Sequence, residues 1–233
     1  MRPHPLCRVS LADGVSITNL LVGFGAICVL TEPTVGGLDS HAIGARAILL
    51  GAIADGLDGL LARYGNHSQI GAVLDSVVDV VTFGVAPGLF VVTLANRSVD
   101  ATGGHLLVAG LASAYVVGAV VRTAIYTTED AQAFRRGVPN TLGAVILAGS
   151  YLAGLDDPLA LAVLAGLFAY LMVIETPYPG LQRVDAVGVG SVQTLAIVLP
   201  PPVGRLLAGL LVVVALAYLL GGPSLYRNRG IMK

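Results

Sequence analysis

Long apolar runs follow one another along the whole chain. They cover residues 15–31, 43–62, 71–95, 105–126, 139–155, 158–176, 190–199 and 203–221. A hydrocarbon core of about 30 Å needs about 20 helical residues, and all runs except the seventh approach that length. The seventh ends at three consecutive prolines beginning with Pro200, which cannot continue a helix. We therefore expect a short or tilted span, a sharp reversal and a final span. The pattern predicts an all-α integral membrane protein, a polytopic bundle of about eight transmembrane helices.

The composition also indicates that lipid is the solvent. Of the 233 residues, 55% are hydrophobic and only 12% are charged, whereas about a quarter of the residues in soluble domains are charged. The net charge of -1 and the absence of a basic run with interleaved aromatics give no reason to expect a nucleic-acid partner. Cys7 and Cys28 indicate neither a disulfide framework nor a thiolate metal site.

We expect a single membrane domain over residues 1–233. The first run is long and lacks a small-residue cleavage pattern, so it should stay in the mature chain. Within this domain, residues 43–95 contain the two helices that carry the polar motif and the loop between them. Residues 190–221 add two C-terminal helices. A second feature is a possible capping box, Ser10 to Asp13, which would open a short interfacial helix.

The connections between the runs differ in charge, and positive residues are retained on the cytoplasmic side of a membrane. With eight spans, most basic residues fall at one end. These are Arg2, Arg8, Arg63, Arg135, Arg136, Arg183, Arg227, Arg229 and Lys233. The opposite connections hold Arg97 and Arg205 among several acidic residues. The pattern predicts a multi-pass protein of the cell membrane with both termini in the cytoplasm.

Four aspartates interrupt the second and third runs. Asp55 and Asp58 lie one turn apart, and so do Asp75 and Asp79, so each pair shares a helix face. If the short loop between the runs makes the helices antiparallel, all four can converge near the cytoplasmic boundary. Carboxylates at membrane depth cost several kcal/mol each unless they bind cations or are partly protonated. Two Mg²⁺ or Mn²⁺ ions about 4 Å apart would suit this site and would serve phosphoryl or phosphatidyl transfer. Any single aspartate could instead cap a helix or form a salt bridge.

Small residues and one arginine follow the first aspartate pair. Gly56 and Gly59 thin the helix so that a phosphate or nucleotide can approach its backbone, and Ala62 continues the small face. Arg63 could neutralise a phosphate, although an arginine at a helix end is often a snorkelling anchor. With Gly71, the pattern resembles the motif of the CDP-alcohol phosphatidyltransferase family. The matching positions are Asp55, Asp58-Gly59, Ala62-Arg63, Gly71, Asp75 and Asp79.

This resemblance implies the CDP-alcohol phosphotransferase fold and an enzyme that joins a CDP-linked lipid to an alcohol and releases CMP. It implies that the four aspartates hold two divalent cations on the diphosphate and that Asp79 also accepts a proton from the attacking hydroxyl. Gly59, Ala62, Arg63 and Gly71 would line the CDP-lipid pocket. Asn19 is a further candidate for phosphate binding, or else a polar residue at the membrane interface. Homodimerisation among membrane lipids is also implied.

The segments around the motif indicate which alcohol is the acceptor. Leu74-Asp75-Ser76 and Val80 to Pro87 resemble the phosphatidylserine synthase branch, and Phe134 to Pro139 and Tyr170 to Pro179 look like its later loops and sixth helix. The resemblance implies L-serine as the acceptor. One position departs from the branch, which usually has two arginines in the fourth helix: this chain has Arg122 and then Ile125.

The remaining arginines have two interpretations each. Arg122 could hold the serine carboxylate with a bidentate guanidinium, or it could snorkel or pair with Glu129 or Asp130. Arg135 and Arg136 could bind the serine carboxylate or a lipid phosphate, or could serve only as topology signals.

Other functions stay open at this stage. A sister enzyme that uses glycerol phosphate, inositol phosphate or another alcohol would keep the four aspartates. A cation transporter could also bury them, but it should have broken helices near mid-membrane. Diacyl and archaeal ether tails would meet the same kind of apolar groove, so both phosphatidylserine and archaetidylserine remain possible products.

Overall fold

The computed structural model describes residues 10–62, 70–99, 102–128, 137–176 and 183–228, and almost all of them are helical. The helices are α1 (Leu11–Leu30), α2 (Ser40–Ala62), α3 (Gly71–Asp79), the π-helix η2 (Val80–Val85), α4 (Ala86–Ser98), α5 (Thr102–Thr128), α6 (Asn140–Ala153), α7 (Pro158–Val173), α8 (Arg183–Val198) and α9 (Val203–Asn228). Since α3, η2 and α4 form one continuous rod, the described ranges contain eight helical rods. The predicted all-α class is confirmed.

Four of the rods are long and apolar enough to cross a membrane. They are Asp13–Leu30, Gly71–Ser98, Thr102–Thr127 and Val203–Gly222. Shorter apolar helices cover Asn140–Ala153, Pro158–Val173 and Val187–Val198. Helix α2 has 23 residues but includes charged side chains such as Arg46 and Asp55, which lower its hydropathy. The number of crossings therefore stays a prediction.

The helix ends follow from local sequence. The predicted capping box is confirmed: Ser10 Oγ accepts a hydrogen bond from the Asp13 backbone N–H (3.2 Å), and Asp13 Oδ2 accepts one from the Ser10 N–H (2.6 Å). It opens the long α1 rather than a short interfacial helix. Helix α8 begins at Arg183, seven residues before the start of the predicted run at residue 190. The prediction began too late because hydropathy alone does not include the polar first turns of this helix.

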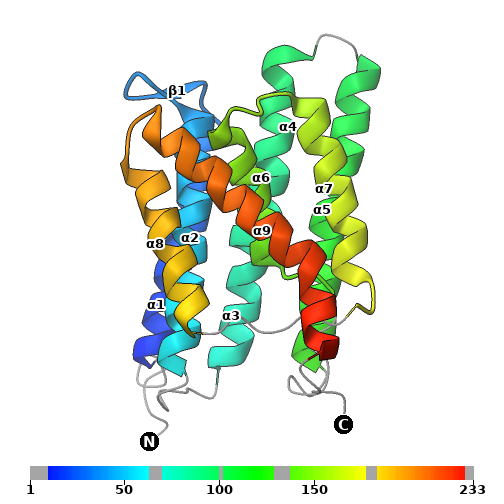
Figure 1. Cartoon of the computed structure of the whole chain (residues 1–233). Helices are drawn as coiled ribbons and strands as arrows, with labels where there is room; N and C mark the ends of the chain where they lie inside the picture. Colours follow the sequence, from blue (N-terminus) through cyan, green and yellow to red (C-terminus); the bar gives the residue numbers. More distant parts are fainter. Residues whose placement is uncertain (1–9, 63–69, 100–101, 129–136, 177–182, 229–233) are drawn as a thin grey trace, which may run out of the picture.

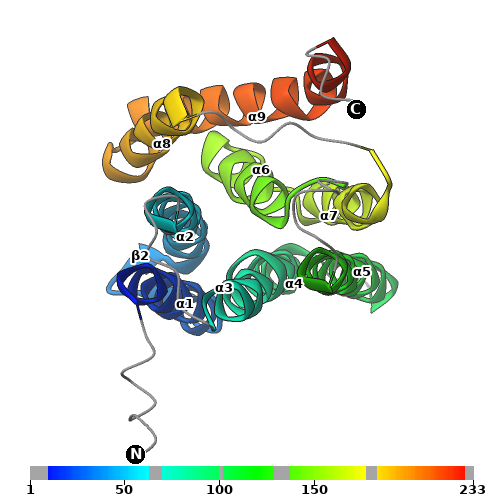
Figure 2. The same cartoon turned by 90° about the horizontal axis from the view of Figure 1, so that it is seen from below.

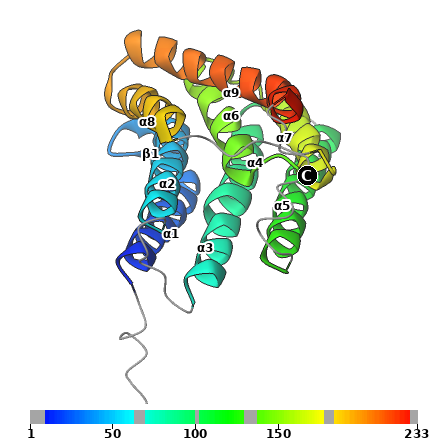
Figure 3. The ribbon, with the colours of Figure 1, turned by 60° about the horizontal axis from the view of Figure 1, so that its bottom comes forward.

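The rods are arranged in rows when viewed along the bundle (Figure 2). Helices α1, α3, α4 and α5 form one row, α2, α6 and α7 form the next, and α8 and α9 cover the outer side. Helix α1 packs on α2, α5 on α7, and α6 on α9. Helix α3 contacts α1 and α5 and stands between them (Figure 3). Helix α1 begins, and α9 ends, at the end of the bundle opposite to the strands β1 and β2 (Figure 1).

A small hairpin joins α1 to α2. Strands β1 (Thr34–Val35) and β2 (Leu38–Asp39) pair antiparallel, and the turn uses the positive φ of Gly36 and Gly37. Asp39 anchors the hairpin to the bundle: it pairs with Arg97 of α4 (2.6 Å) and accepts a hydrogen bond from Tyr151 of α6 (2.7 Å). Burial alone would raise the pKa of Asp39, but the hydrogen bonds from Arg97, Tyr151 and the Ala42 N–H outweigh it and lower the pKa to about 2.

A π-helical segment interrupts the rod directly after Asp79. Pro87 has no N–H to offer the Phe83 carbonyl, its partner four residues earlier in an α-helix. The buried Tyr115 hydroxyl of α5 donates to that carbonyl instead (2.9 Å). Ala86 donates to the Val81 carbonyl with the longer spacing of a π-turn. Such turns are often found at functional sites.

Candidate active site

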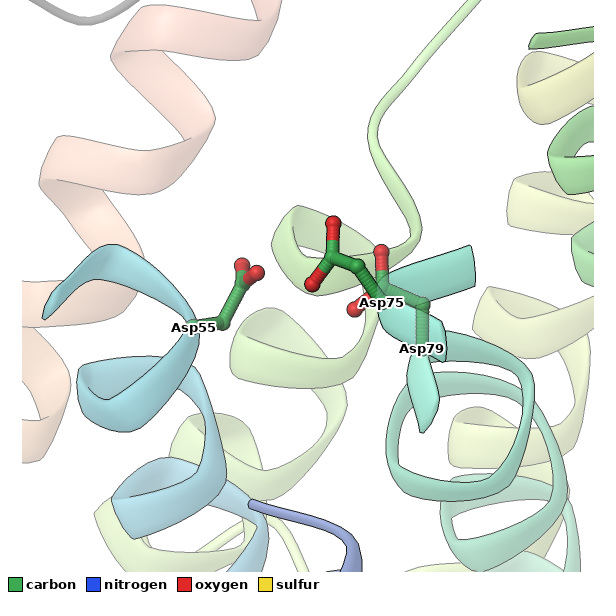
Figure 4. Close-up of side chains that lie close together, drawn as sticks. All are labelled: Asp55, Asp75 and Asp79. Atoms are coloured by element: carbon green, nitrogen blue, oxygen red, sulfur yellow. The ribbon is translucent and has the colours of Figure 1, made fainter. Parts of the chain in front are cut away.

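Three of the four predicted aspartates meet between α2 and α3. One carboxylate oxygen from each of Asp55, Asp75 and Asp79 lies within 4.8 Å of the others, and all three side chains are partly buried. Asp55 approaches from α2, whereas Asp75 and Asp79 approach from α3 (Figure 4). The one-turn spacing of Asp75 and Asp79 places both on the face of α3 that is directed toward α2. The two helices thus present their acidic groups to one space.

Asp58, the fourth predicted aspartate, lies next to this group. It is close enough to interact electrostatically with Asp55, Asp75 and Asp79. Its Oδ2 accepts a short hydrogen bond from Ser16 Oγ of α1 (2.6 Å), while its Oδ1 is buried and has no hydrogen-bond partner among the described residues. Asp58 thus interacts both with α1 and with the acidic group, and the convergence of all four carboxylates stays a prediction.

The donor set fits hard divalent cations. Asp55 Oδ2 accepts a hydrogen bond from Thr141 Oγ1 at the start of α6 (3.1 Å). Asp79 Oδ1 is buried and, like Asp58 Oδ1, has no hydrogen-bond partner within the described ranges. Buried oxygens without a donor are rare in proteins, and carboxylate oxygens are the ligands that Mg²⁺ and Mn²⁺ prefer. The acidic group could therefore bind a metal ion.

Arg122 of α5 faces the acidic group. Its guanidinium interacts electrostatically with Asp79 and Asp55. Its Cζ lies 5.5 Å from the centre of the Tyr126 ring, and its Nε is buried without a hydrogen-bond partner in the described part of the chain. These contacts direct the Arg122 side chain toward the acidic group. Pairing with Glu129 or Asp130 concerns residues outside the described ranges.

Asn19 is placed inside the bundle. It is only 1% exposed, so its side chain faces neighbouring helices and not the surface of the bundle. Its Oδ1 has no hydrogen-bond partner among the residues described and lies 2.8 Å from where a Cβ on Gly51 would be. The Asn19 backbone carbonyl accepts a hydrogen bond from Thr82 Oγ1 of η2 (3.3 Å). Gly51 lies one turn before Asp55 on α2, so Asn19 is packed near the acidic group.

The other predicted pocket residues are only partly covered by the structure. Gly59 is exposed, and no atom lies within 4 Å of a Cβ built on it. Gly71 begins α3 and is partly buried. Ala62 ends α2. Arg63, Arg135 and Arg136 lie outside the described residues.

Sequence reasoning missed Ser16 and Thr141, the two hydroxyls that bind the aspartates. Both are small polar residues within or beside apolar runs, where a hydroxyl commonly bonds to its own helix backbone. Ser16 shares a helix face with Asn19, three residues later, and this pairing of polar residues within the first apolar run was the available signal. Nothing comparable marks Thr141.

Comparison with known proteins identifies the family. The family model of the CDP-alcohol phosphatidyltransferases matches residues 9–178. The archaetidylserine synthase of Methanothermobacter thermautotrophicus is 29% identical over 188 residues, which cover 78% of this chain and 74% of that protein. The CDP-diacylglycerol–serine O-phosphatidyltransferase of Methanocaldococcus jannaschii is 30% identical over 174 residues, 73% of this chain and 74% of the relative. The protein of the same name from Saccharomyces cerevisiae is 39% identical over 82 residues, 34% of this chain and 30% of the relative.

The family match includes the motif and both helices that carry it, and it confirms the predicted resemblance. It also agrees with the four long apolar helices in placing the protein in a membrane. The chain is a membrane enzyme that belongs to the CDP-alcohol phosphatidyltransferase family.

Proposed function

We propose that this protein transfers a phosphatidyl or archaetidyl group from a CDP-lipid to the hydroxyl of L-serine. The serine oxygen forms a bond to the phosphorus that carries the lipid, the bond from that phosphorus to the CMP oxygen breaks, and the serine hydroxyl loses its proton. The observation that carries the proposal is the meeting of Asp55, Asp75 and Asp79 across two helices in a chain of this family. The names of the two archaeal relatives support serine as the acceptor.

Two divalent cations, Mg²⁺ or Mn²⁺, are part of the proposal. Asp55, Asp58, Asp75 and Asp79 would hold them, with the unpartnered oxygens of Asp58 and Asp79 available as ligands. When bound, the ions supply positive charge to the diphosphate and to the leaving CMP. Ser16 and Thr141 each occupy one carboxylate oxygen and leave the other oxygen of the same aspartate available.

Asp79 is proposed as the group that accepts the serine proton. It belongs to the acidic group, and it directly precedes the π-turn of η2. A carboxylate is a weak base, so its position matters more than its basicity: it must lie within hydrogen-bond reach of the hydroxyl as the new bond forms. Arg122 is proposed to hold the serine carboxylate. Its guanidinium interacts electrostatically with Asp79, and a bidentate arginine suits a carboxylate.

The CDP-lipid would lie along the motif face of α2. The open space beside Gly59 leaves room for a phosphate or nucleotide, and Ala62, Arg63 and Gly71 would continue this surface. Asn19 would contribute from α1. Arg135 and Arg136 would bind lipid phosphate or the serine carboxylate. We further propose a homodimer of multi-pass, single-domain subunits whose active site and termini are cytoplasmic.

A sister reaction with glycerol phosphate or inositol phosphate is the second candidate. Such acceptors would need several cations around the acceptor pocket, and Arg122 is the one that faces the acidic group in the described part of the chain. Arg135 and Arg136, which could supply further cations, lie outside the described residues, so the support for serine comes from the names of the two archaeal relatives. The transporter alternative is not supported, because the chain belongs to a family of transferases.

The test measures CMP release by the purified protein in detergent. Each reaction contains either CDP-diacylglycerol or its archaeal ether analogue, Mg²⁺ or Mn²⁺, and one alcohol from a panel. We expect serine to release more CMP than glycerol 3-phosphate or inositol phosphate. Equal or lower release with serine would overturn the serine assignment while leaving the family activity intact.

Asp79→Asn tests the proposed base. The variant should lose turnover but keep the circular dichroism spectrum and thermal midpoint of a folded protein, since the amide has nearly the same size. Asp156→Asn is the matched control, because Asp156 is exposed near the end of α6 and should keep full activity. Near-normal turnover of Asp79→Asn would exclude Asp79 as the base.

Arg122→Gln tests the proposed acceptor contact. Its KM for serine should rise by about tenfold or more, because a charged hydrogen bond contributes about 1.5–3 kcal/mol. Its KM for the CDP-lipid should change little. An equal rise in both constants would argue for a general effect of Arg122 on the site.

A further inference from the structure

The start of α6 is held in place by the end of α7. The N–H of Gly137 donates to the Thr176 carbonyl (2.9 Å), and the N–H of Val138 donates to the Leu171 carbonyl (3.0 Å). Gly137 has a φ of 73°, and a Cβ at this position would collide with the Met172 carbonyl oxygen. The backbone before α6 therefore packs directly on the backbone at the end of α7, and this contact fixes the first turn of α6.

Asn140, the first residue of α6, binds α5 through its side chain. Its Nδ2 donates to the Ala119 carbonyl (3.2 Å) and to Thr123 Oγ1 (2.8 Å). Because a carbonyl oxygen can only accept, the amide nitrogen of Asn140 and not its amide oxygen must face Ala119. The side chains of Asn140 and Thr123 are both buried. The amide group thus attaches α5 to the fixed first turn of α6.

The next residue, Thr141, binds α2 at the acidic group. Its Oγ1 donates to Asp55 Oδ2 (3.1 Å). On α5, the Asn140 partner Thr123 directly follows Arg122 in the chain. Arg122 in turn interacts electrostatically with Asp55. Two consecutive residues of α6 therefore connect the helix that carries Arg122 with the helix that carries Asp55.

Packing alone does not account for an asparagine at this position. Asn140 is 1% exposed, and its Oδ1 has no hydrogen-bond partner in the described part of the chain. A buried oxygen without a donor lowers stability, and such atoms are rare in folded proteins. An apolar side chain of similar size would avoid this cost. The amide is therefore better explained by the two hydrogen bonds that it donates to α5.

We propose that Asn140 is a positioning residue for the acceptor alcohol. By attaching α5 to the start of α6, it sets the distance between the Arg122 guanidinium and the acidic group. This distance determines where a serine held by its carboxylate places its hydroxyl. A displacement of about 1 Å can lower a reaction rate by about 100-fold, so a small movement of α5 would affect turnover. The proposal rests on the role of Arg122 in the proposed function.

Steady-state kinetics of CMP release by the full chain in detergent test the proposal. Thr123→Val removes one acceptor of the Asn140 amide and keeps the shape of the side chain. Its kcat/KM for serine should fall by about three- to tenfold. Thr123→Ser keeps the hydroxyl and should retain the wild-type value. The KM for the CDP-lipid should change little in both variants, because Arg122 is proposed to contact the acceptor alcohol.

Asn140→Ala removes both hydrogen bonds to α5. Its kcat/KM for serine should fall by about tenfold or more. If the amide and the hydroxyl act through one contact, adding Thr123→Val to Asn140→Ala should cause little further loss. Should Asn140→Ala fail to fold, the comparison of Thr123→Val with Thr123→Ser still tests the proposal.

Thr93→Val is the matched control. Thr93 Oγ1 of α4 forms a hydrogen bond with His41 Nε2 of α2 (3.0 Å), so this variant also loses a contact between two helices. His41 precedes Asp55 by 14 residues, or about 21 Å along α2. Thr93→Val should lower the thermal midpoint to an extent similar to Thr123→Val and should keep the wild-type kcat/KM for serine.

Two results would overturn the proposal. The first is a wild-type kcat/KM for serine in Thr123→Val and Asn140→Ala. The second is an equal loss toward serine and toward the CDP-lipid, which would indicate a general loosening of the bundle. A wild-type enzyme that does not prefer serine would instead overturn the proposed function. The alcohol that it prefers would then replace serine in the same comparison of variants, so the two failures are distinguishable.

Discussion

The hydrogen bond from Tyr115 to the Phe83 carbonyl offers a sharp test of how the π-turn is stabilised. Tyr115→Phe removes only the hydroxyl and leaves the ring in its fully buried position. The Phe83 carbonyl then loses its side-chain donor, and Pro87 has no N–H to replace it. A buried acceptor without a partner costs about 1–3 kcal/mol. For a domain of this size, that loss lowers the thermal midpoint by roughly 2–12 °C.

The measurement must not depend on tryptophan, because the chain has none. Thermal unfolding in detergent is followed instead by the loss of the helical circular dichroism signal. Tyr170→Phe is the matched control: it is the same chemical change on α7, where the side chain is 66% exposed. The control should have the wild-type midpoint. If Tyr115→Phe also melted at the wild-type temperature, the carbonyl would have another donor and our account of the π-turn would be wrong.

Three further predictions concern the site, the packing and the hairpin. Ser16→Ala should weaken Mn²⁺ binding by about 10- to 100-fold, because Asp58 loses the hydroxyl that orients it. Electron paramagnetic resonance measures this affinity, and the control Ser16→Thr should keep the wild-type value. Unchanged affinity in the alanine variant would contradict this role of Ser16. Gly118→Ala should lower the free energy of unfolding by about 1–3 kcal/mol, since the new Cβ would lie 2.8 Å from a backbone carbonyl oxygen of α7. An unchanged midpoint of thermal unfolding would show that α5 and α7 can separate easily. The pKa of Asp39 is lowered from 3.8 to about 2, so its stabilising effect is complete above the unfolded pKa and is lost as the pH falls through the folded value. The difference in midpoint between wild type and Asp39→Asn should therefore shrink from about pH 5 to about pH 2, and a constant difference would mean that the Arg97 contact does not depend on the charge.

The helices and the membrane environment could be predicted from the sequence because both depend on local properties. Each apolar run is long enough to form a helix by itself, and the caps at Ser10 and Asp157 are set by side chains a few residues from the backbone groups they bind. The one-turn spacing of the aspartates is local too. It placed each pair on one helix face before the packing of the helices was known.

Partners that are distant in the chain could not be predicted in this way. Ser16 and Asp58 are 42 residues apart, and Thr141 and Asp55 are 86 residues apart. Their contacts depend on how the helices pack against one another, and hydropathy gives no information about that packing. The direction of Arg122 was undecided for the same reason, since one arginine in a span can face lipid, a loop or the interior.

The sequence by itself determined that this protein is a helical membrane enzyme of one family, with four acidic groups on two neighbouring helices. Only the tertiary structure decided that three of those groups share one space, that Ser16 of α1 donates a hydrogen bond to the fourth, and that Arg122 faces them. The physical reason is that residue spacing determines the face of a helix, whereas the packing of helices determines what that face meets.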